Sequence, residues 1–327
     1  FFSVALQAQN SHLQITLKQA DSLFMTRNFK LLAQNFEIQA AKALEIQAKV
    51  YPNPNVSFEF NVYDPDNNKY FHTSGTNAQK VFKIEQLILL GGKRKAELAV
   101  AKSNTKLAEI EFEKLILELQ KKLHHTMAQV FEQQKLVDVY NNQYQLVQNL
   151  VTEYEKQASK GNIALKEVVR LKGALLQLNT TRSELITDYL ENQENLQVLL
   201  RSNDDVKPLL TEADYQNYIK LVSLSDLQNK ILQYNPELKE AQEQTVLAQA
   251  ILYNEKKQRI PNITLMANYD QNSGAYANEI NGGIAMDLPF FNRNKGNIKA
   301  AKYKLDQANT NNEAVKQSIV LSLQKQW

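Results

Sequence analysis

The sequence has no cysteine, a single tryptophan, few helix breakers and no long apolar run. Its 327 residues include only 9 glycines and 7 prolines. The absence of cysteine excludes disulfides, thiolate metal sites and a lipid-bearing N-terminal Cys among these residues. No stretch of about 18 apolar residues is present, so a membrane span within this sequence would have to consist of β-strands.

The sequence also has no large excess of charge of either sign. The sequence has 38 Lys and Arg residues against 35 Asp and Glu residues, which gives a formal net charge of +3. Basic residues alternate with Glu and Gln, so no basic stripe marks a nucleic-acid surface, and no nucleic acid is expected as a partner. With 43% hydrophobic residues the chain can build a sizeable core.

The chain contains an internal duplication. Residues 1–58 match, without a gap, the sequence that lies 207 positions later. Asn28-Phe29-Lys30-Leu31 matches Asn235-Pro236-Glu237-Leu238, and Pro54-Asn55-Val56-Ser57-Phe58 matches Pro261-Asn262-Ile263-Thr264-Leu265. Ala101-Lys102 matches Ala301-Lys302 at a shift of 200. We therefore expect a first structural repeat over 9–207, then a linker or equatorial segment and a second repeat over 208–327.

The two ends of the sequence carry weaker signals. Residues 1–8 resemble the end of an apolar signal sequence with cleavage after Ala8, although an apolar chain terminus explains them too. Trp327 ends a helical pattern that has no capping residue, so the second repeat is expected to be truncated.

The distribution of glycine and proline predicts two very long helices. Neither residue occurs between Lys93 and Lys160, and only Gly173 interrupts the span from Asn162 to Lys207. Apolar residues recur at intervals of three and four in both spans, a 3.5-residue period typical of coiled-coil packing. A helix over 93–157 would be about 95 Å long. Gly161 is expected to form the tight turn of a helical hairpin.

Four polar residues interrupt the apolar seam of the predicted hairpin. Two interpretations remain open: they fix the register of the two helices, or they line a water-filled passage. The residues are Thr126, Gln133, Arg182 and Asn192.

Between the helices the hydrophobic period changes to two, which predicts β-strands over 55–64, 80–90, 262–271 and 282–290. Their lengths suit tilted membrane strands. The residues expected to face lipid are Phe58, Phe60, Ile263 and Leu265, and those expected to face the lumen are Glu59, Asn61, Asp270 and Asp287. Aromatic residues near the strand ends fit interfacial girdles, although they are also ordinary in soluble strands.

Four strands cannot close a barrel, and an open edge in lipid would leave backbone N–H and C=O groups unpaired. We therefore expect a barrel shared between copies. Three copies would supply twelve strands, within the range of barrels that hold a channel. The predicted fold class is mainly α with a membrane β-barrel: long coiled-coil hairpins plus two β-hairpins per chain, in a trimeric 12-stranded barrel continued by a periplasmic α-barrel.

No catalytic, cofactor-binding or metal-binding constellation stands out, and the chain is not expected to be an enzyme. The adjacent pair His124-His125 is the one tempting cluster. Neighbouring side chains on a helix point about 100° apart, so the pair cannot hold one ion together.

The order of these features resembles the TolC-type outer membrane efflux family, in particular its heavy-metal and multidrug branch. Asn235-Pro236-Glu237-Leu238 is similar to the family's N-P-x-L motif, although Phe29 replaces the proline in the first repeat. Gly91-Gly92-Lys93-Arg94-Lys95 is similar to its glycine and basic cluster, and residues 154–168 to its helix-tip segment. Pro54 and Pro261 precede the strands as they do in the family.

The resemblance implies a homotrimeric channel in the outer membrane of a Gram-negative-type bacterium that extends into the periplasm. Such a channel passively exports drugs, metal ions or other substrates in a tripartite efflux or type I secretion system, together with a periplasmic adaptor (membrane fusion) protein and an inner-membrane pump. The tip that would dock the adaptor comprises Lys160, Gly161, Asn162 and Ile163. The alternative role of Gly161 is to form the turn without contacting the adaptor. The alternative is a soluble periplasmic coiled-coil adaptor or scaffold.

Overall fold

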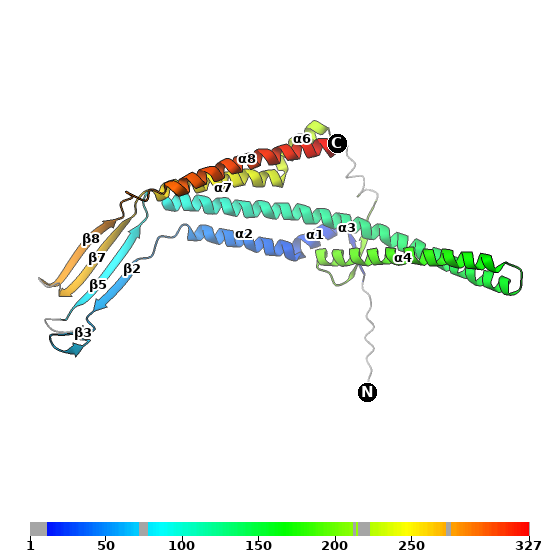
Figure 1. The fold of residues 1–327 in the computed structure, drawn as a ribbon, viewed down its shortest axis with the longest axis horizontal. Coiled ribbons are helices and arrows are strands. Elements are labelled where there is room, and N and C mark those ends of the chain that lie inside the picture. The colour runs from blue at the N-terminus through cyan, green and yellow to red at the C-terminus, as the bar shows by residue number, and fades with distance from the viewer. Residues whose placement is uncertain (1–11, 72–77, 212–213, 215–222, 273–275, 327) are drawn as a thin grey trace. The chain divides into compact units, whose positions relative to one another are not determined.

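The computed structural model describes residues 12–71, 78–211, 214, 223–272 and 276–326 (Figure 1). The expected signal remnant at 1–8 lies outside the described residues. The chain forms two compact units, one from residues 1–36 and 112–223 and one from residues 37–111 and 224–327. Both sequence repeats contribute to the second unit, so the units are not the repeats. No helix of the described part is long and apolar enough to cross a membrane.

The first unit contains a short parallel sheet and a long helical hairpin. Strand β1 (His12–Thr16) pairs in parallel with β6 (Asp205–Leu209), so that Ile15 lies opposite Pro208. Helix α1 (Leu17–Arg27) follows β1 through a capping box between Thr16 and Gln19. Helix α3 (Lys93–Ser159), which belongs to this unit from Phe112 onward, forms the hairpin with helix α4 (Leu165–Leu200). Its largest fully buried core residues are Phe24, Ile15, Leu123, Met127, Leu196, Leu200, Val130 and Val206.

Polar bonds inside the α3–α4 hairpin connect residues that interrupt the apolar seam. Asn192 Nδ2 donates to Gln133 Oε1 at 3.1 Å. Arg182 Nε donates to Asn141 Oδ1 at 2.6 Å, and its guanidinium lies 5.0 Å from the centre of the Tyr144 ring. These bonds join the two helices at defined positions along their length. Gln133, Arg182 and Asn192 therefore set the register of the hairpin, one of the two roles predicted for them.

The second unit contains the main sheet. Strands β2 (Asn55–Phe60), β5 (Lys80–Ile88), β7 (Ile263–Asn272) and β8 (Ala277–Met286) are antiparallel and lie in the order β2-β5-β7-β8 (Figure 1). Each repeat supplies one hairpin, and β5 and β7 join the two hairpins in the centre of the sheet. The small strands β3 (Tyr63–Asp64) and β4 (Lys69–Tyr70) pair with each other in the loop after β2.

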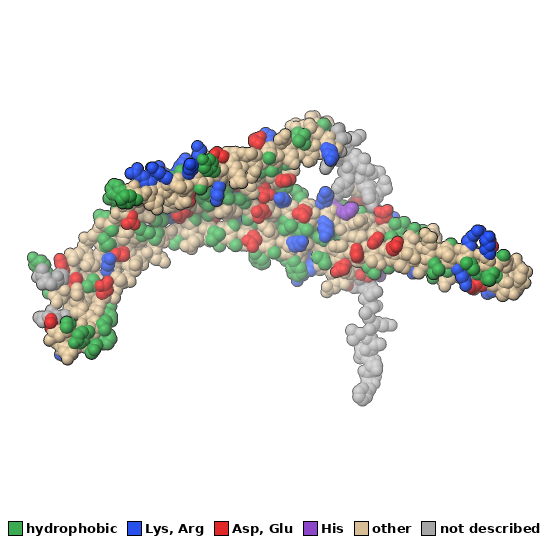
Figure 2. Space-filling view, in the orientation of Figure 1, with side chains coloured by type: hydrophobic (Ala, Val, Ile, Leu, Met, Phe, Trp, Pro, Cys, Tyr) green, Lys and Arg blue, Asp and Glu red, His purple; other side chains and the backbone are tan. Residues whose placement is uncertain are grey.

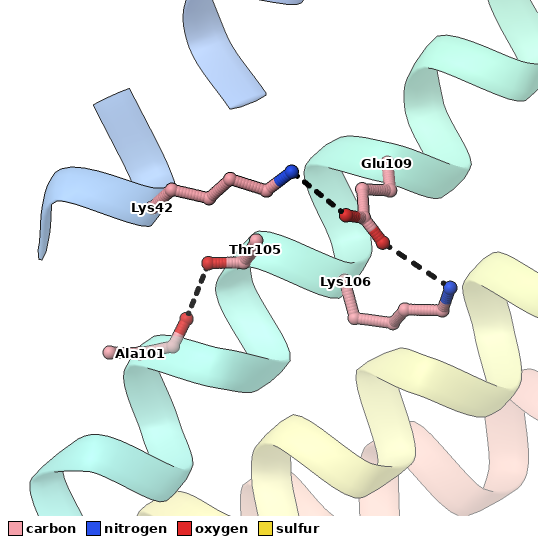
Figure 3. Close-up of polar contacts among 5 residues, drawn as sticks. All are labelled: Lys42, Ala101, Thr105, Lys106 and Glu109. Carbon is pink, nitrogen blue, oxygen red and sulfur yellow. Dashed lines mark hydrogen bonds and ion pairs between the residues drawn. The ribbon is translucent and has the colours of Figure 1, made fainter. Parts of the chain in front are cut away.

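Helices of the second unit lie at one end of this sheet (Figure 1). Helix α7 (Pro236–Gln258), which follows α6 (Leu224–Tyr234), packs along α8 (Lys295–Gln326). Helix α2 (Phe29–Gln47) contacts α3 through Lys42, whose Nζ lies 3.5 Å from Glu109 Oε1 (Figure 3). Lys106 Nζ lies 3.4 Å from the second oxygen of the same carboxylate. Since these side chains are largely exposed, the ion pairs add about 1 kcal/mol or less to stability.

The structure changes several predicted boundaries. The last strand covers 277–286 rather than 282–290, because its Asn- and Gly-rich first half has little hydrophobic alternation to predict a strand. The first strand ends at Phe60 rather than at residue 64. The β2–β5 and β7–β8 hairpins pair Val56 with Ile84 and Ile263 with Met286, so the return strands correspond at a shift of 202 residues.

Candidate membrane sheet and helical tip

The four-stranded sheet has two faces of opposite chemistry. Residues paired across antiparallel strands share a face, and successive residues alternate between faces. Phe58, Phe82, Tyr269 and Ile280 form one paired row across all four strands. The adjacent row on the other face comprises Glu59, Val81, Asp270 and Glu279. The alternation in the sequence therefore produces one apolar and one polar face.

The apolar face is the more exposed of the two. Phe58 is 57% exposed, Ile280 79% and Ile284 72%. Along the middle of β7, Leu265, Ala267 and Tyr269 of the apolar face are exposed, whereas the residues of the polar face are half-buried. A soluble sheet covers its apolar face with other elements, so this arrangement is reversed.

The polar face carries charges of both signs. Lys83 pairs with Glu85 on β5. Asp270 lies directly opposite Glu279, and Gln79 donates from Nε2 to Asp270 Oδ2 at 3.4 Å. Carboxylates placed directly opposite each other repel. They are therefore best accommodated where water and counterions reach them.

The two outer strands of the sheet each pair on one side only within the described chain. Strand β2 pairs with β5, and β8 pairs with β7. Edge strands expose rows of N–H and C=O groups. Because the order is antiparallel throughout and the strand number is even, β8 of one copy can pair antiparallel with β2 of another, and the alternation continues.

The structure brings together most of the predicted strand residues. Those expected to face lipid are Phe58, Phe60, Ile263 and Leu265, and all four fall in strands at positions of the apolar face. Glu59 and Asp270 share the polar face. Asn61 and Asp287 lie just beyond the ends of β2 and β8, so their expected placement within strands is incorrect. Five residues that complete the two rows were absent from the predicted sets: Phe82, Tyr269, Ile280, Val81 and Glu279. The Gly282-Gly283 pair obscured the pattern of β8 in the sequence.

The helical tip is a compact turn between α3 and α4. Gly161 has φ +76°, a left-handed conformation that costs other residues energy. Gly161 N–H donates to the carbonyl of Ala158 and Asn162 N–H to that of Gln157, both at 3.0 Å, which is the Schellman pattern. The side chain of Asn162 also donates to Gln157 Oε1 at 2.7 Å. The predicted turn at Gly161 is therefore present.

The surface of the tip is open. Lys160, Gly161 and Asn162 are exposed, and Ile163 is half-buried. Leu165 is 72% exposed and Val169 62%. Behind the tip an ion pair joins the two helices, with Lys172 Nζ 2.5 Å from Glu155 Oε1. The turn is thus held by its own hydrogen bonds and leaves polar and apolar side chains uncovered.

His124 has a structural partner rather than a metal site. Its Nε2 lies 2.8 Å from Asp21 Oδ1, an oxygen that also accepts from Gln120 Nε2 at 3.0 Å. These contacts join α1 to α3. No group of three or more His, Cys, Asp or Glu residues suited to a metal ion occurs in the described part of the chain.

The fold is that of solved outer membrane channels. It matches a crystal structure of CusC with a TM-score of 0.70 at 16% identity, over 93% of this chain and 73% of that one. The CusC structures concern conformational changes that accompany folding and transmembrane channel formation. It also matches the Campylobacter jejuni CmeC outer membrane channel with a TM-score of 0.71 at 16% identity, over 94% of this chain and 70% of that one. The chain therefore has the fold of TolC-type channels.

The sequence comparisons agree with the fold. Residues 227–326 match the family described as "Outer membrane efflux protein". Over 296 residues the chain is 26% identical to the cobalt-zinc-cadmium resistance protein CzcC of Cupriavidus metallidurans, covering 90% of this chain and 68% of that protein. The resemblance to the outer membrane efflux family is confirmed.

Proposed function

We propose that three copies of this chain form an outer membrane channel that is a passive conduit and not an enzyme. The observation that carries this proposal is the reversed sheet, whose apolar residues such as Phe58 and Ile280 are exposed while the polar-face residues of the central strands β5 and β7 are half-buried. With lipid on the apolar side and water on the polar side, both faces are satisfied. Twelve antiparallel strands from three copies leave no open edge.

The long hairpins supply the second part of the channel. Helix α3 has 67 residues, which corresponds to about 100 Å at 1.5 Å per residue. Helices of this length, with exposed apolar residues along them, suit a periplasmic α-barrel in which copies pack side by side. The tip at 160–163 then docks a periplasmic adaptor, which links the channel to an inner-membrane pump.

Metal cations are the cargo that we favour over drugs. The polar face aligns Glu59, Asp270 and Glu279 in one row, which gives a water-filled lumen a band of carboxylates. The curated relative CzcC is named for cobalt, zinc and cadmium resistance. Restored growth on these metals, but not on drugs, in a strain that lacks its own channel would support this cargo.

Electron microscopy of the detergent-solubilised protein tests the architecture. We expect a threefold tube about 100 Å or more in length. A protein that is extracted without detergent and remains a folded monomer would contradict the channel and support the soluble adaptor or scaffold. The reversed sheet argues against that alternative, because a soluble protein would expose an apolar surface to water.

A further inference from the structure

A basic cavity lies beside the start of α3, in the second unit. Its volume is about 360 Å³, and the charged residues that line it are Lys49, Arg94 and Lys95. None of its described lining residues is acidic. Tyr51 and Ala48 form part of the wall. We refer to it as the α3 cavity.

Arg94 has unused hydrogen-bonding capacity beside this cavity. Its guanidinium carbon lies 3.6 Å from the centre of the Tyr51 ring, which holds the group in a fixed plane. Its Nη1 is buried and has no hydrogen-bond partner in the described chain. An unpaired buried donor is unfavourable, and more so when the group is charged. A guanidinium in a fixed plane fits the oxygen atoms of a phosphate.

The start of α3 adds positive potential. Lys93, Arg94 and Lys95 occupy its first turn, which contains no acidic residue. The N-terminal end of a helix carries a partial positive charge, so cations there are unfavourable unless an anion is nearby. Lys93 is directed away from the cavity, because its Nζ donates to Asn262 Oδ1 at 2.8 Å. Burial lowers the pKa of Lys93, and the Glu97 carboxylate partly opposes this shift.

The second repeat shows what the first one lacks. At the corresponding end of α7, Glu255 Oε2 accepts from Asn294 Nδ2 at 2.6 Å, just before α8 begins. By the 207-residue shift, the counterpart of Glu255 is Ala48. The first repeat thus has a methyl group and a cavity where the second has a carboxylate. No carboxylate of the described lining therefore faces Arg94 across the α3 cavity.

The position of the cavity indicates the source of the anion. Tyr51 lies four residues before β2, and Arg94 six residues after β5, so the cavity lies at the helix end of the reversed sheet. Figure 2 shows further Lys and Arg side chains on the α7–α8 pair near the same junction. Exposed tyrosines and basic residues just outside an apolar band are typical of membrane interfaces. Clusters of basic residues there attract anionic lipids.

We propose that the α3 cavity binds the phosphate group of an anionic phospholipid in the leaflet that faces the helices. This inference rests on the proposed function, because it requires that the sheet spans the membrane. The bound phosphate is paired with the Arg94 guanidinium and with Lys49 and Lys95, which line the cavity. It thereby fixes the depth of the sheet in the bilayer.

Retention of phosphatidylglycerol tests the proposal. The full chain is reconstituted into phosphatidylcholine bilayers with and without phosphatidylglycerol, and the lipids retained on the protein are counted by native mass spectrometry. Two variants act on the cavity by different routes. Arg94→Gln removes the donor, whereas Ala48→Glu supplies the carboxylate of the second repeat and gives Arg94 an internal partner. Lys121→Gln removes an exposed positive charge further along α3 and serves as the control.

We expect each cavity variant to retain phosphatidylglycerol about fivefold less well, while Lys121→Gln behaves as the unchanged protein. If Arg94→Gln fails to assemble, Ala48→Glu still decides, because it fills the cavity without leaving a buried charge unpaired. Equal retention by Ala48→Glu and the unchanged protein would overturn the proposal. So would binding of inorganic phosphate without any preference for phosphatidylglycerol.

Two further outcomes separate this inference from the proposed function. If the protein inserts into both bilayers but never retains phosphatidylglycerol, and Ala48→Glu weakens the oligomer, the cavity holds a carboxylate of a second copy. In that case only the lipid site is overturned. If the protein enters neither bilayer, the proposed channel fails together with the lipid site.

Discussion

Asn28 donates a hydrogen bond from Nδ2 to the carbonyl oxygen of Leu199 at 2.9 Å, and it thereby ties the joint between α1 and α2 to the end of α4. Its Oδ1 accepts from the N–H of Lys30 at 3.0 Å and so caps α2. Asn235 caps α7 in the same way, through Leu238 N–H at 3.1 Å. One asparagine thus joins two helices in each repeat, and in the first repeat it also reaches a third.

Replacement of Asn28 by Ala should therefore cost more stability than replacement of Asn235. Loss of either cap costs about 1 kcal/mol. Asn28→Ala also removes the donor to the Leu199 carbonyl. Because this hydrogen bond is buried, its loss lowers the free energy of unfolding by about 1 to 3 kcal/mol more. Thermal unfolding followed by circular dichroism measures both. Equal losses in the two variants would show that the Leu199 contact contributes nothing.

The polar pair in the α3–α4 hairpin allows a double-mutant test. Asn192→Leu should lower the free energy of unfolding by about 1 kcal/mol, because the part-buried Gln133 amide loses its partner. With Gln133→Leu added, both polar groups are gone, and much of the loss should be recovered. If the double variant is as unstable as the sum of the two single ones, the pair does not interact in the folded protein.

The reversed sheet predicts opposite responses at neighbouring positions. Phe58→Arg places a charge on the exposed apolar face and should cost about 2 to 4 kcal/mol near the bilayer midplane. Ser57→Arg places the same charge on the polar face, opposite Lys83. Water and the Glu85 carboxylate that pairs with Lys83 reduce the repulsion there, so this substitution should cost much less than Phe58→Arg. Assembly of heat-resistant oligomers on gels reports the difference. Equal effects of the two substitutions would mean that the faces are wrongly assigned.

Much of this architecture is predictable from the sequence, because the hydrophobic period changes where the fold changes. The seam of the long helices, the turn at Gly161 and the alternation around Phe58 each follow from spacing alone. The β1–β6 pair was not predicted. Its strands are five residues each, one contains Pro208, and they lie far apart in the sequence, so no local pattern reveals their pairing.

The first half of β8 and the α3 cavity could not be predicted from the sequence, for a different reason. Asn278 and Asn281 lack the apolar alternation of a strand, and the strand is held there by pairing with β7. The contrast between Ala48 and Glu255 was visible in the duplication. Its meaning depends on the contact between Glu255 and Asn294, which only the structure gives.

The turn at the tip can be separated from its surface by substitution. Gly161→Ala should cost about 1 to 2 kcal/mol, since a Cβ is strained at φ +76°. It leaves Lys160 and Asn162 in place. Unfolding of the purified protein measures the cost, and an unchanged stability would mean that the turn relaxes to another conformation.

Lys160→Glu tests adaptor docking, because it reverses an exposed charge and leaves the Schellman bonds of Gly161 and Asn162 intact. If the adaptor docks at 160–163, oligomers should assemble normally in the outer membrane, while resistance in cells that depend on this channel is lost. Lys121→Glu makes the same charge change further along α3 and should leave resistance unchanged. Unchanged resistance in Lys160→Glu and in a second variant with a bulky residue at Asn162 would mean that the adaptor binds elsewhere. The tip would then be only the structural end of the hairpin, since its own hydrogen bonds suffice to hold the turn.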